Sequence, residues 1–430
     1  MKNLETTKIG KKNWIVLVLL GLSGQIAWNV ENSWFNTFVF DTITPDPKPI
    51  AVMVAVSAIV ATVTTLIIGT LSDRVGKRKP FIFVGYTLWA LSTIAYPMAG
   101  WTRNVQLAVF LVIALDAMMT FFGSTANDAT FNAWVTDITD ETNRGTVEGV
   151  LMILPVLAIV MGMGLSGVLI DTVGYFAFFL TLGGFVLIMG LIGSLLLKES
   201  PGLRPRIESS QKGFFLDLID VFSPKSIKKN KELYLVFLTM VLYNISMEIT
   251  APYGMIYLNN YLEISKSTAG LLSTIVAPVL IIFALPIGKL TDKGKGFTVI
   301  TFGYIIGSLG SILYSFTDSL VFLGVTTAVQ AIGVLMNIVL MVWIRNLMPK
   351  DARGQFQGVR MIFMVALPMV IGPTIGSFLI QNFGIPTVLN GQAGFIPTPL
   401  IYQTAGIVSL LPLIPVYFLR KQCKKSGITI

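Results

Sequence analysis

The chain contains twelve apolar runs of about 20 residues or more, the length a helix needs to cross the hydrocarbon core of a membrane. In the first half they cover 14–40, 50–71, 80–100, 105–135, 146–170 and 174–197. In the second half they cover 233–262, 267–288, 297–317, 320–344, 355–381 and 400–419. Lipid offers no hydrogen bonds to a backbone, and runs this long exclude the short alternating strands of a barrel. The sequence therefore predicts an all-α membrane protein with twelve transmembrane helices.

Composition agrees with the membrane assignment and excludes much of enzyme chemistry. Apolar residues make up 54% of the chain and charged residues 12%, too little polar surface for a soluble globule of 430 residues. The chain has no His and one Cys, Cys423, which excludes imidazole catalysis, Cys–His nucleophiles, thiolate or imidazole metal sites and disulfides. We therefore expect no enzyme, no cofactor and no metal site.

Basic residues are distributed unequally between the predicted loops. With both termini on one side, 27 of the 31 Lys and Arg residues fall on that side, against Lys48, Arg103 and Lys266 on the other. The positive-inside rule then predicts cytoplasmic termini and a multi-pass protein of the cell membrane. Topology and lipid headgroups also account for the net charge of +9, so we expect no nucleic-acid partner.

A signature is repeated about half a chain apart. Gly69-Thr70-Leu71-Ser72-Asp73-Arg74 closes the second run, and Gly288-Lys289-Leu290-Thr291-Asp292-Lys293 closes the eighth. Trp134 matches Trp343, and Arg144-Gly145 matches Arg353-Gly354, each 209 positions later. A membrane chain of two parallel halves is typical of a transporter whose substrate path runs between them. We predict two pseudo-symmetric six-helix bundles, 1–197 and 232–430, joined by a cytoplasmic linker, 198–231, which contains a short interfacial helix near 214–221.

Ionisable residues inside the runs are functional candidates, because charge in hydrocarbon is costly. They are Glu31, Asp116, Asp128, Glu148, Glu248 and Arg360. Asp116, Glu31 and Glu248 are our candidates for cation coupling, since a coupling site needs a carboxylate whose charge depends on the state of the cavity.

Polar residues also follow helical spacing. Gln25, Asn29, Asn32 and Asn36 form one stripe on the first run, and Asp116, Thr120, Gly123 and Asn127 repeat the same spacing on the fourth. On the seventh run Asn244 and Glu248 share a face, and Gln330 and Asn337 lie seven apart on the tenth. Together with Trp28, Tyr243 and Tyr253, they suit a polyhydroxylated ligand. Packing remains the alternative for the aromatic residues, as does bonding between helices for one or two amides.

The segment Gly69–Lys79 and its second copy resemble the signature loop of the major facilitator superfamily, and the resemblance covers the whole chain. It implies that Asp73 latches the cytoplasmic side shut against the start of the eleventh helix, favoured by the helix dipole. Asp292 would do the same against the fifth helix, with Arg74, Arg144 and Arg353 as further gating charges.

Two further matches narrow the resemblance. Gly76-Lys77-Arg78-Lys79-Pro80-Phe81-Ile82 resembles a run in sucrose–proton symporters. Asp128-Ala129-Thr130-Phe131, followed by Trp134 and Ile138-Thr139, resembles a pattern in glycoside–pentoside–hexuronide:cation symporters, which implies that Asp128 binds sugar hydroxyls. The predicted substrate site is Asp128, Asn127, Trp28, Asn29, Asn32, Tyr243, Asn244, Tyr253, Gln330 and Asn337.

The preferred interpretation is a monomeric secondary active transporter that takes up a sugar or glycoside with a proton or sodium ion by alternating access. No G-x-x-x-x-G-K-[ST] motif occurs, which argues against direct use of ATP. A proton-coupled exporter of drugs or metabolites with the same fold is the alternative, disfavoured because the glycines of the fifth helix, Gly162, Gly164 and Gly167, have no Pro among them. A sensor that no longer transports, or a membrane enzyme, is the remote alternative.

Overall fold

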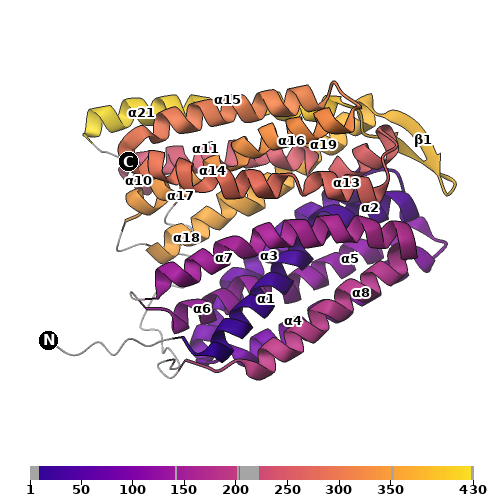
Figure 1. Ribbon diagram of the computed structural model, residues 1–430, viewed down its shortest axis with the longest axis horizontal. Coiled ribbons are helices and arrows are strands. Elements are labelled where there is room, and N and C mark those ends of the chain that lie inside the picture. Colours follow the sequence, from indigo (N-terminus) through magenta and orange to yellow (C-terminus); the bar gives the residue numbers. More distant parts are fainter. Residues whose placement is uncertain (1–8, 141–142, 201–202, 204–221, 350–352, 428–430) are drawn as a thin grey trace. The chain divides into compact units, whose positions relative to one another are not determined.

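The computed structural model describes residues 9–140, 143–200, 203, 222–349 and 353–427, and nearly all of them are helical (Figure 1). Ten helical stretches of the described chain are long and apolar enough to span a membrane. Two of these, Arg144–Leu196 and Lys266–Tyr314, have 53 and 49 residues, about twice the length of one crossing. Each contains a glycine with positive φ, Gly174 at 76° and Gly294 at 72°. Each long stretch therefore supplies two crossings, and the described part of the chain has the twelve that the apolar runs predict.

The chain forms two compact units. The first consists of Met1–Ile43 and Ile59–Ser209, and the second of Thr44–Ala58 and Ser210–Ile430. Helix α3 (Pro47–Val75) is continuous across the division, so its first residues belong to the second unit and the rest to the first. Most of the predicted linker, including the helix expected near 214–221, lies outside the described residues, and the bundle boundaries at 197 and 232 stay a prediction.

Six crossings begin in the first half of the chain. Their helices are α1 (Lys11–Val30), α2 (Asn36–Phe38), α3, α4 (Lys79–Ala95), α5 (Val105–Gly123), α6 (Asn132–Ile138), α7 (Arg144–Ala158) and α8 (Ser166–Leu196). Between them lie wider π-helical segments, η1 (Glu31–Phe35), η2 (Val39–Ile43), η4 (Ser124–Phe131) and η5 (Ile159–Leu165), and the 3₁₀ segment η3 (Tyr96–Trp101).

The second half supplies the remaining crossings. Its helices are α10 (Pro224–Lys229), α11 (Lys231–Thr250), α12 (Gly254–Ile256), α13 (Lys266–Ser273), α14 (Val276–Leu290), α15 (Gly296–Tyr314), α16 (Leu320–Val334), α17 (Met336–Leu347), α18 (Arg353–Met361), α19 (Leu367–Phe383), α20 (Leu400–Val408) and α21 (Leu413–Ser426). The π-helical segments η6 (Tyr257–Tyr261), η7 (Thr291–Lys295) and η9 (Ile362–Ala366) connect some of them.

Small residues let helices within each unit approach closely. A methyl group added to Gly183 of α8 would lie 2.8 Å from the backbone oxygen of Ala90 on α4. In the second unit, a methyl group on Gly307 of α15 would lie 2.8 Å from Cα of Gly333 on α16. Such contacts are how membrane helices pack where water supplies no hydrophobic drive between them.

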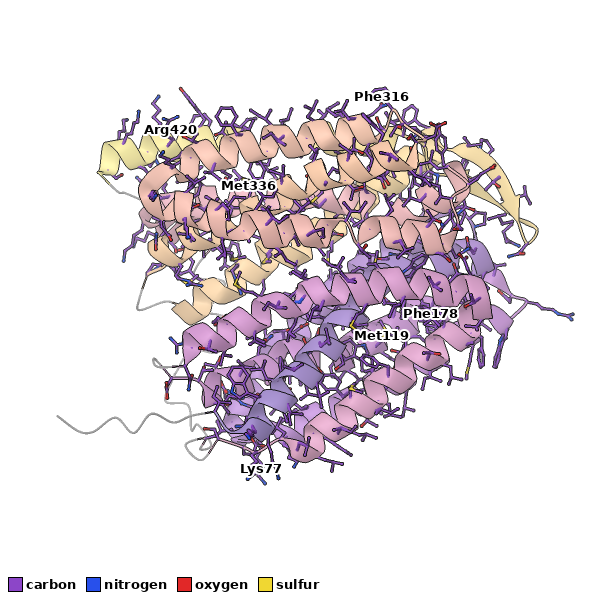
Figure 2. All side chains as sticks on the ribbon, viewed as in Figure 1. Lys77, Met119, Phe178, Phe316, Met336 and Arg420 are labelled. Atoms are coloured by element: carbon purple, nitrogen blue, oxygen red, sulfur yellow. The ribbon has the colours of Figure 1, made fainter. Side chains whose placement is uncertain are left out.

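Large apolar side chains cover the outside of the spans, as lipid-facing surfaces require. Phe316 is 70% exposed, and Leu285 and Val321 are more exposed still, whereas Met119, Phe178 and Met336 lie in the interior of their units (Figure 2). The polar side chains that the interior does contain are therefore unusual enough to mark candidate sites.

One element departs from the all-helical expectation. Strands β1 (Ile385–Leu389) and β2 (Gln392–Ile396) pair antiparallel, with Leu389 opposite Gln392. The two turn residues, Asn390 and Gly391, have φ of 52° and 76°, the left-handed backbone of a type I′ turn. This hairpin follows the eleventh crossing and lies at the end of the second unit opposite the C-terminal part of α21 (Figure 1). The hairpin is a local exception within the all-α fold, because the turn chemistry of Asn390-Gly391 favours paired strands.

Candidate functional site

A buried acidic group lies where the first and fourth crossings of the first unit meet. Thr120 of α5 donates a hydrogen bond to Glu31 Oε1 at 3.0 Å, and Glu31 is 7% exposed. Asp116 lies one helical turn before Thr120 and is 2% exposed. The charges of Asp116 and Asp128 are the two acidic charges that act on Glu31. Like charges that act on one another in a buried site need compensation by a proton or another cation.

Asp128 extends this group along η4. Its Oδ2 accepts a hydrogen bond from the Ser124 hydroxyl at 2.9 Å, and the indole of Trp28 lies beside the carboxylate. Asp128 is half-buried, so its remaining acceptor sites can meet a ligand. The structure thus brings together four predicted site residues, Glu31, Asp116, Asp128 and Trp28.

Asn127, next in the chain, points into helix packing. Its Nδ2 donates to the Tyr86 hydroxyl at 2.9 Å, and that hydroxyl donates to the Leu20 carbonyl at 2.7 Å. A methyl group on Gly24 would lie 2.2 Å from the same Nδ2, so α1 passes directly over the amide. The contacts favour bonding between helices for Asn127, the alternative expected for one or two amides, because the π-helical turns of η4 shift the α-helical phase.

The amides of the first span are held along their own helix. Asn29 Nδ2 donates to the Gln25 carbonyl and Asn32 Nδ2 to the Trp28 carbonyl, both at 2.9 Å. Asn36 Nδ2 donates to the Asn32 carbonyl at 3.1 Å. Asn32 is exposed and Asn29 half-buried, whereas Asn36 is buried. Asn29 and Asn32 are therefore the members of the stripe that can reach a ligand.

The corresponding residues of the second unit lie on α11 and face the eleventh crossing. A methyl group on Gly372 of α19 would lie 2.4 Å from Glu248 Cβ, so the backbone of α19 passes close to α11 at this residue. Asn244 Nδ2 donates to the Met364 carbonyl at 3.1 Å. The Tyr253 hydroxyl lies 3.0 Å from the Pro373 carbonyl, and Tyr253 is fully buried. These contacts give Asn244 and Tyr253 a packing role in this conformation.

The remaining candidates of the second unit lie on three helices, α11, α16 and α17. Tyr243 stacks on Tyr304 of α15 with ring centroids 4.7 Å apart. Gln330 lies on α16 and Asn337 on α17, because the tenth crossing is interrupted at Leu335 and the two residues do not share one continuous helix. Asn337 Oδ1 is buried and has no hydrogen-bond donor among the described residues. A buried acceptor without a donor is a candidate contact for a ligand hydroxyl.

Arg78 fixes the position of the predicted gating loop, although the sequence alone assigned it no role. Arg78 donates to Asp73 Oδ1 at 2.5 Å and to Asp137 Oδ2 at 2.9 Å, and its side chain is 4% exposed. Burial disfavours its charge, but the bonds and charges of Asp137 and Asp73 outweigh burial and raise the pKa of Arg78 above its ordinary value. The Glu199 carboxylate also contacts this loop, because it accepts hydrogen bonds from the backbone N–H groups of Arg78 and Lys79 at 2.9 and 2.8 Å.

The other predicted gating charges lie at helix ends. Arg74 is exposed at the end of α3, Arg144 is exposed at the start of α7, and Asp292 is exposed in η7. Arg353 begins α18, and its side chain lies outside the described residues. Their latching roles stay predictions.

The side chain of Arg360 contacts a methionine sulfur of its own unit. Its Nη1 lies 3.5 Å from Met341 Sδ on α17. Its Nε is buried and has no acceptor among the described residues.

Two cavities lie in the described part of the second unit, and the predicted substrate residues line neither of these two. One of about 660 Å³ lies at the hairpin and includes Asp46, Lys48 and Gln381, and one of about 540 Å³ includes Tyr257, Tyr261 and Glu263. In the described part of the chain, no group of three or more acidic, His or Cys side chains is placed to hold a metal ion.

The closely packed spans, apolar outer surface and buried carboxylates define a helical membrane transporter rather than an enzyme. The model of the Major Facilitator Superfamily matches residues 14–259 and 236–427. The chain belongs to the major facilitator superfamily.

Curated relatives and solved structures agree with this family. Sugar efflux transporter A of Dickeya chrysanthemi is 26% identical over 284 residues, 64% of this chain and 66% of that protein. A putative proline/betaine transporter of Staphylococcus haemolyticus (strain JCSC1435) is 24% identical, and the match covers 63% of this chain and 58% of that protein. The chain thus spans less than two thirds of the length of either relative.

Solved structures show the same fold at lower identity. A mutant form of the nucleoside transporter NupG matches with a TM-score of 0.71 at 16% identity, covering 94% of this chain and 99% of that one. A POT family transporter in complex with 5-aminolevulinic acid matches with a TM-score of 0.72 at 13% identity, covering 95% and 96%.

Proposed function

We propose that this protein is a cation-coupled transporter of a sugar or glycoside, with a proton as the coupling ion. The observation that carries the proposal is the buried acidic group of Glu31, Asp116 and Asp128, which needs a compensating cation inside the membrane. A relative named as a sugar efflux transporter supports a sugar as the substrate. Secondary carriers of this architecture work by exposing a central site alternately to the two sides.

The acidic group divides into a coupling part and a substrate part. Glu31 and Asp116 are the more buried carboxylates, and a proton bound there would remove the repulsion between them. Asp128 is half-buried beside Trp28, so it can accept from sugar hydroxyls while the indole covers an apolar face of the ring. Transport of the substrate is coupled to the proton if substrate binding at Asp128 depends on the charge of Glu31 and Asp116.

Residues of the second unit are also proposed as substrate contacts. Tyr243 offers an aromatic surface, while Asn337 Oδ1 offers an unoccupied acceptor. Asn244, Tyr253 and Gln330 complete the set, and Glu248 is the coupling candidate of this unit. Release of the bonds that hold Asn244 and Tyr253 would be part of the transport cycle.

Export of a sugar is the second candidate function. The named activity of the first relative is efflux, which favours this direction, whereas the match to symporter motifs favours uptake. The same carboxylates would serve either direction, because a carrier runs according to the gradients applied.

The orientation and surroundings are also proposed. The excess of Lys and Arg on the side of the termini supports a cytoplasmic location for both ends in the cell membrane. Asp73 and Asp292, with Arg74, Arg144 and Arg353, are proposed to gate the cytoplasmic side, and the protein to work as a monomer.

The test is uptake into proteoliposomes with an imposed pH gradient, with and without sodium, over a panel of sugars, glycosides, proline and betaine. We expect a sugar or glycoside to accumulate with the proton gradient and to carry protons with it, measured by an internal pH dye. Loading the vesicles instead with substrate tests export. Transport of only proline or betaine would overturn the sugar assignment, and uptake without any ion dependence would overturn coupling.

A further inference from the structure

The β1–β2 hairpin holds the first residues of the second crossing. The backbone N–H of Phe395 in β2 donates to the Pro45 carbonyl at 3.1 Å. Gln381 of α19 donates its side-chain amide to Asp46 Oδ1 at 3.1 Å. The Tyr253 hydroxyl lies 3.3 Å from the Pro47 carbonyl. Three consecutive residues, 45 to 47, are thus held by three different elements of the second unit.

Gly394 shows how closely the hairpin approaches this segment. A methyl group at Gly394 would lie 2.3 Å from both the carbonyl carbon and oxygen of Pro45 and 2.7 Å from the Asp46 nitrogen. Backbone atoms of a proline cannot shift as the end of a side chain can, so only glycine fits the present contact. We refer to the contacts of residues 45–47 with Phe395, Gln381, Tyr253 and Gly394 as the clasp.

Helix α3 makes the clasp mechanically important. Residues 44–58 belong to the second compact unit, whereas the same helix continues into the first unit from Ile59. If the two units move as bodies during transport, α3 cannot remain packed on both. The clasp consists of hydrogen bonds that individually contribute little, so it is the part of α3 that can release and reform.

We propose that the clasp is a gate on the side opposite the termini, closed by the hairpin in the structure described and opened once in each transport cycle. The inference rests on the proposed transport function and on the cytoplasmic location of the termini. The hairpin is the closing strap, and Asp46, Gln381 and Gly394 are positioning residues that act through the gate rather than on the substrate.

A labelling experiment tests the gate without any substrate. In a Cys423→Ser background, Asn32→Cys introduces a single thiol on the exposed polar face of the first span. Its reaction with a membrane-impermeant maleimide added outside whole cells reports the outward-open state. Gly394→Ala should raise the labelling rate about fivefold, the shift expected from losing one hydrogen bond. Ala393→Ser is the matched control, since Ala393 is an exposed neighbour in the same strand, and its rate should equal the parent's.

Gln381→Leu covers the case in which Gly394→Ala fails to fold. It removes the hydrogen bond to Asp46 and keeps a side chain of similar size, so the labelling rate should rise here as well. Unchanged rates in the folded variants would overturn the gate, whatever substrate the protein carries.

A cross-link tests whether the gate must open. Asp46→Cys with Gln381→Cys, bridged by a short bis-methanethiosulfonate, should stop transport of the sugar found in the panel, and reduction should restore it. Val388→Cys with Ala393→Cys, opposite each other within the hairpin, is the control pair and should transport normally when bridged. Full transport by the bridged Asp46–Gln381 pair would overturn the proposal. If the protein transports no sugar, the labelling experiment still tests whether the clasp is a gate. In that case only the proposal of a sugar as substrate is overturned.

Discussion

Thr120 donates a hydrogen bond to the Glu31 carboxylate at 3.0 Å and so joins the fourth crossing to the first inside the membrane. Glu31→Gln keeps the size of the side chain but removes its charge. We expect this variant to exchange substrate between equally loaded compartments while losing accumulation against a gradient, because the coupling charge is gone. Counterflow and pH-driven uptake of radiolabelled sugar measure the two activities.

Asp116→Asn should behave in the same way, and Thr120→Val is the control that removes the bond but leaves both carboxylates. If the amide variants of Glu31, Asp116 and Glu248 all concentrate substrate like the parent, the coupling site lies elsewhere and Asp128 must serve both roles.

Substitutions of the adjacent residues Asp128 and Asn127 should affect different properties, sugar affinity in one case and stability in the other. Asp128→Asn should weaken sugar binding about tenfold or more, because a charge-assisted hydrogen bond contributes about 1.5–3 kcal/mol. Asn127→Ala should instead leave affinity close to the parent's and lower stability by about 1 kcal/mol, the value of its bond to Tyr86. Isothermal titration and thermal unfolding in detergent separate the two, and normal affinity in Asp128→Asn would remove that residue from the site.

Arg78→Met should destabilise the first unit. Arg78 is buried, while Asp73 and Asp137 are 41% and 21% exposed, so solvent screens part of the loss. We expect a loss of about 1–3 kcal/mol from leaving these groups without their shared donor. Adding Asp137→Asn should recover part of it by removing one of the two repelling charges. A thermal melt of the double variant no better than that of Arg78→Met would contradict the pairing.

Asp73→Asn tests the proposed latch. The variant should insert normally but populate the outward-open state less, since a carboxylate at a helix N-terminus contributes up to about 2 kcal/mol when partly buried. The measurement is modification of cysteines in the cytoplasmic cavity by an impermeant reagent in inside-out vesicles. Unchanged accessibility together with an unchanged transport rate would leave Asp73 as a partner of Arg78 only.

Tyr253→Phe removes one hydroxyl that lies near two carbonyls, those of Pro373 and Pro47. We expect a loss of about 1 kcal/mol in stability, typical of one hydrogen bond. If Tyr253 binds substrate directly, affinity falls as well, and a titration of the purified variant distinguishes this from a packing role alone.

The crossings were predictable because lipid leaves the chain little choice. Apolar runs had to be helical, and the gap left between 170 and 174 coincides with the positive φ of Gly174. The hairpin at 385–396 lies in a loop between two crossings, where the hydropathy that predicts spans carries no signal, although Asn390-Gly391 favours a hairpin turn.

The candidate site was predictable only in part. The cost of a charge in hydrocarbon singled out Glu31, Asp116 and Asp128. Helical spacing was a poorer guide, because α-helical phase does not hold through the π-helical turns of η4, where Asn127 turns towards Tyr86. The bond between Arg78 and Asp137 joins residues 59 positions apart, and one sequence carries no record of such a pairing.

The division of α3 between the two compact units limits how the chain can be split into an N-terminal and a C-terminal fragment. A break in the connection near residue 209 would leave residues 44–58 on the N-terminal fragment, although they pack as part of the second unit. The C-terminal fragment would then lack one of its own packing segments, and the N-terminal fragment would carry an apolar half-helix without its surroundings. We expect two such fragments to accumulate in cells only when both are made together, because each would lack part of its packing surface.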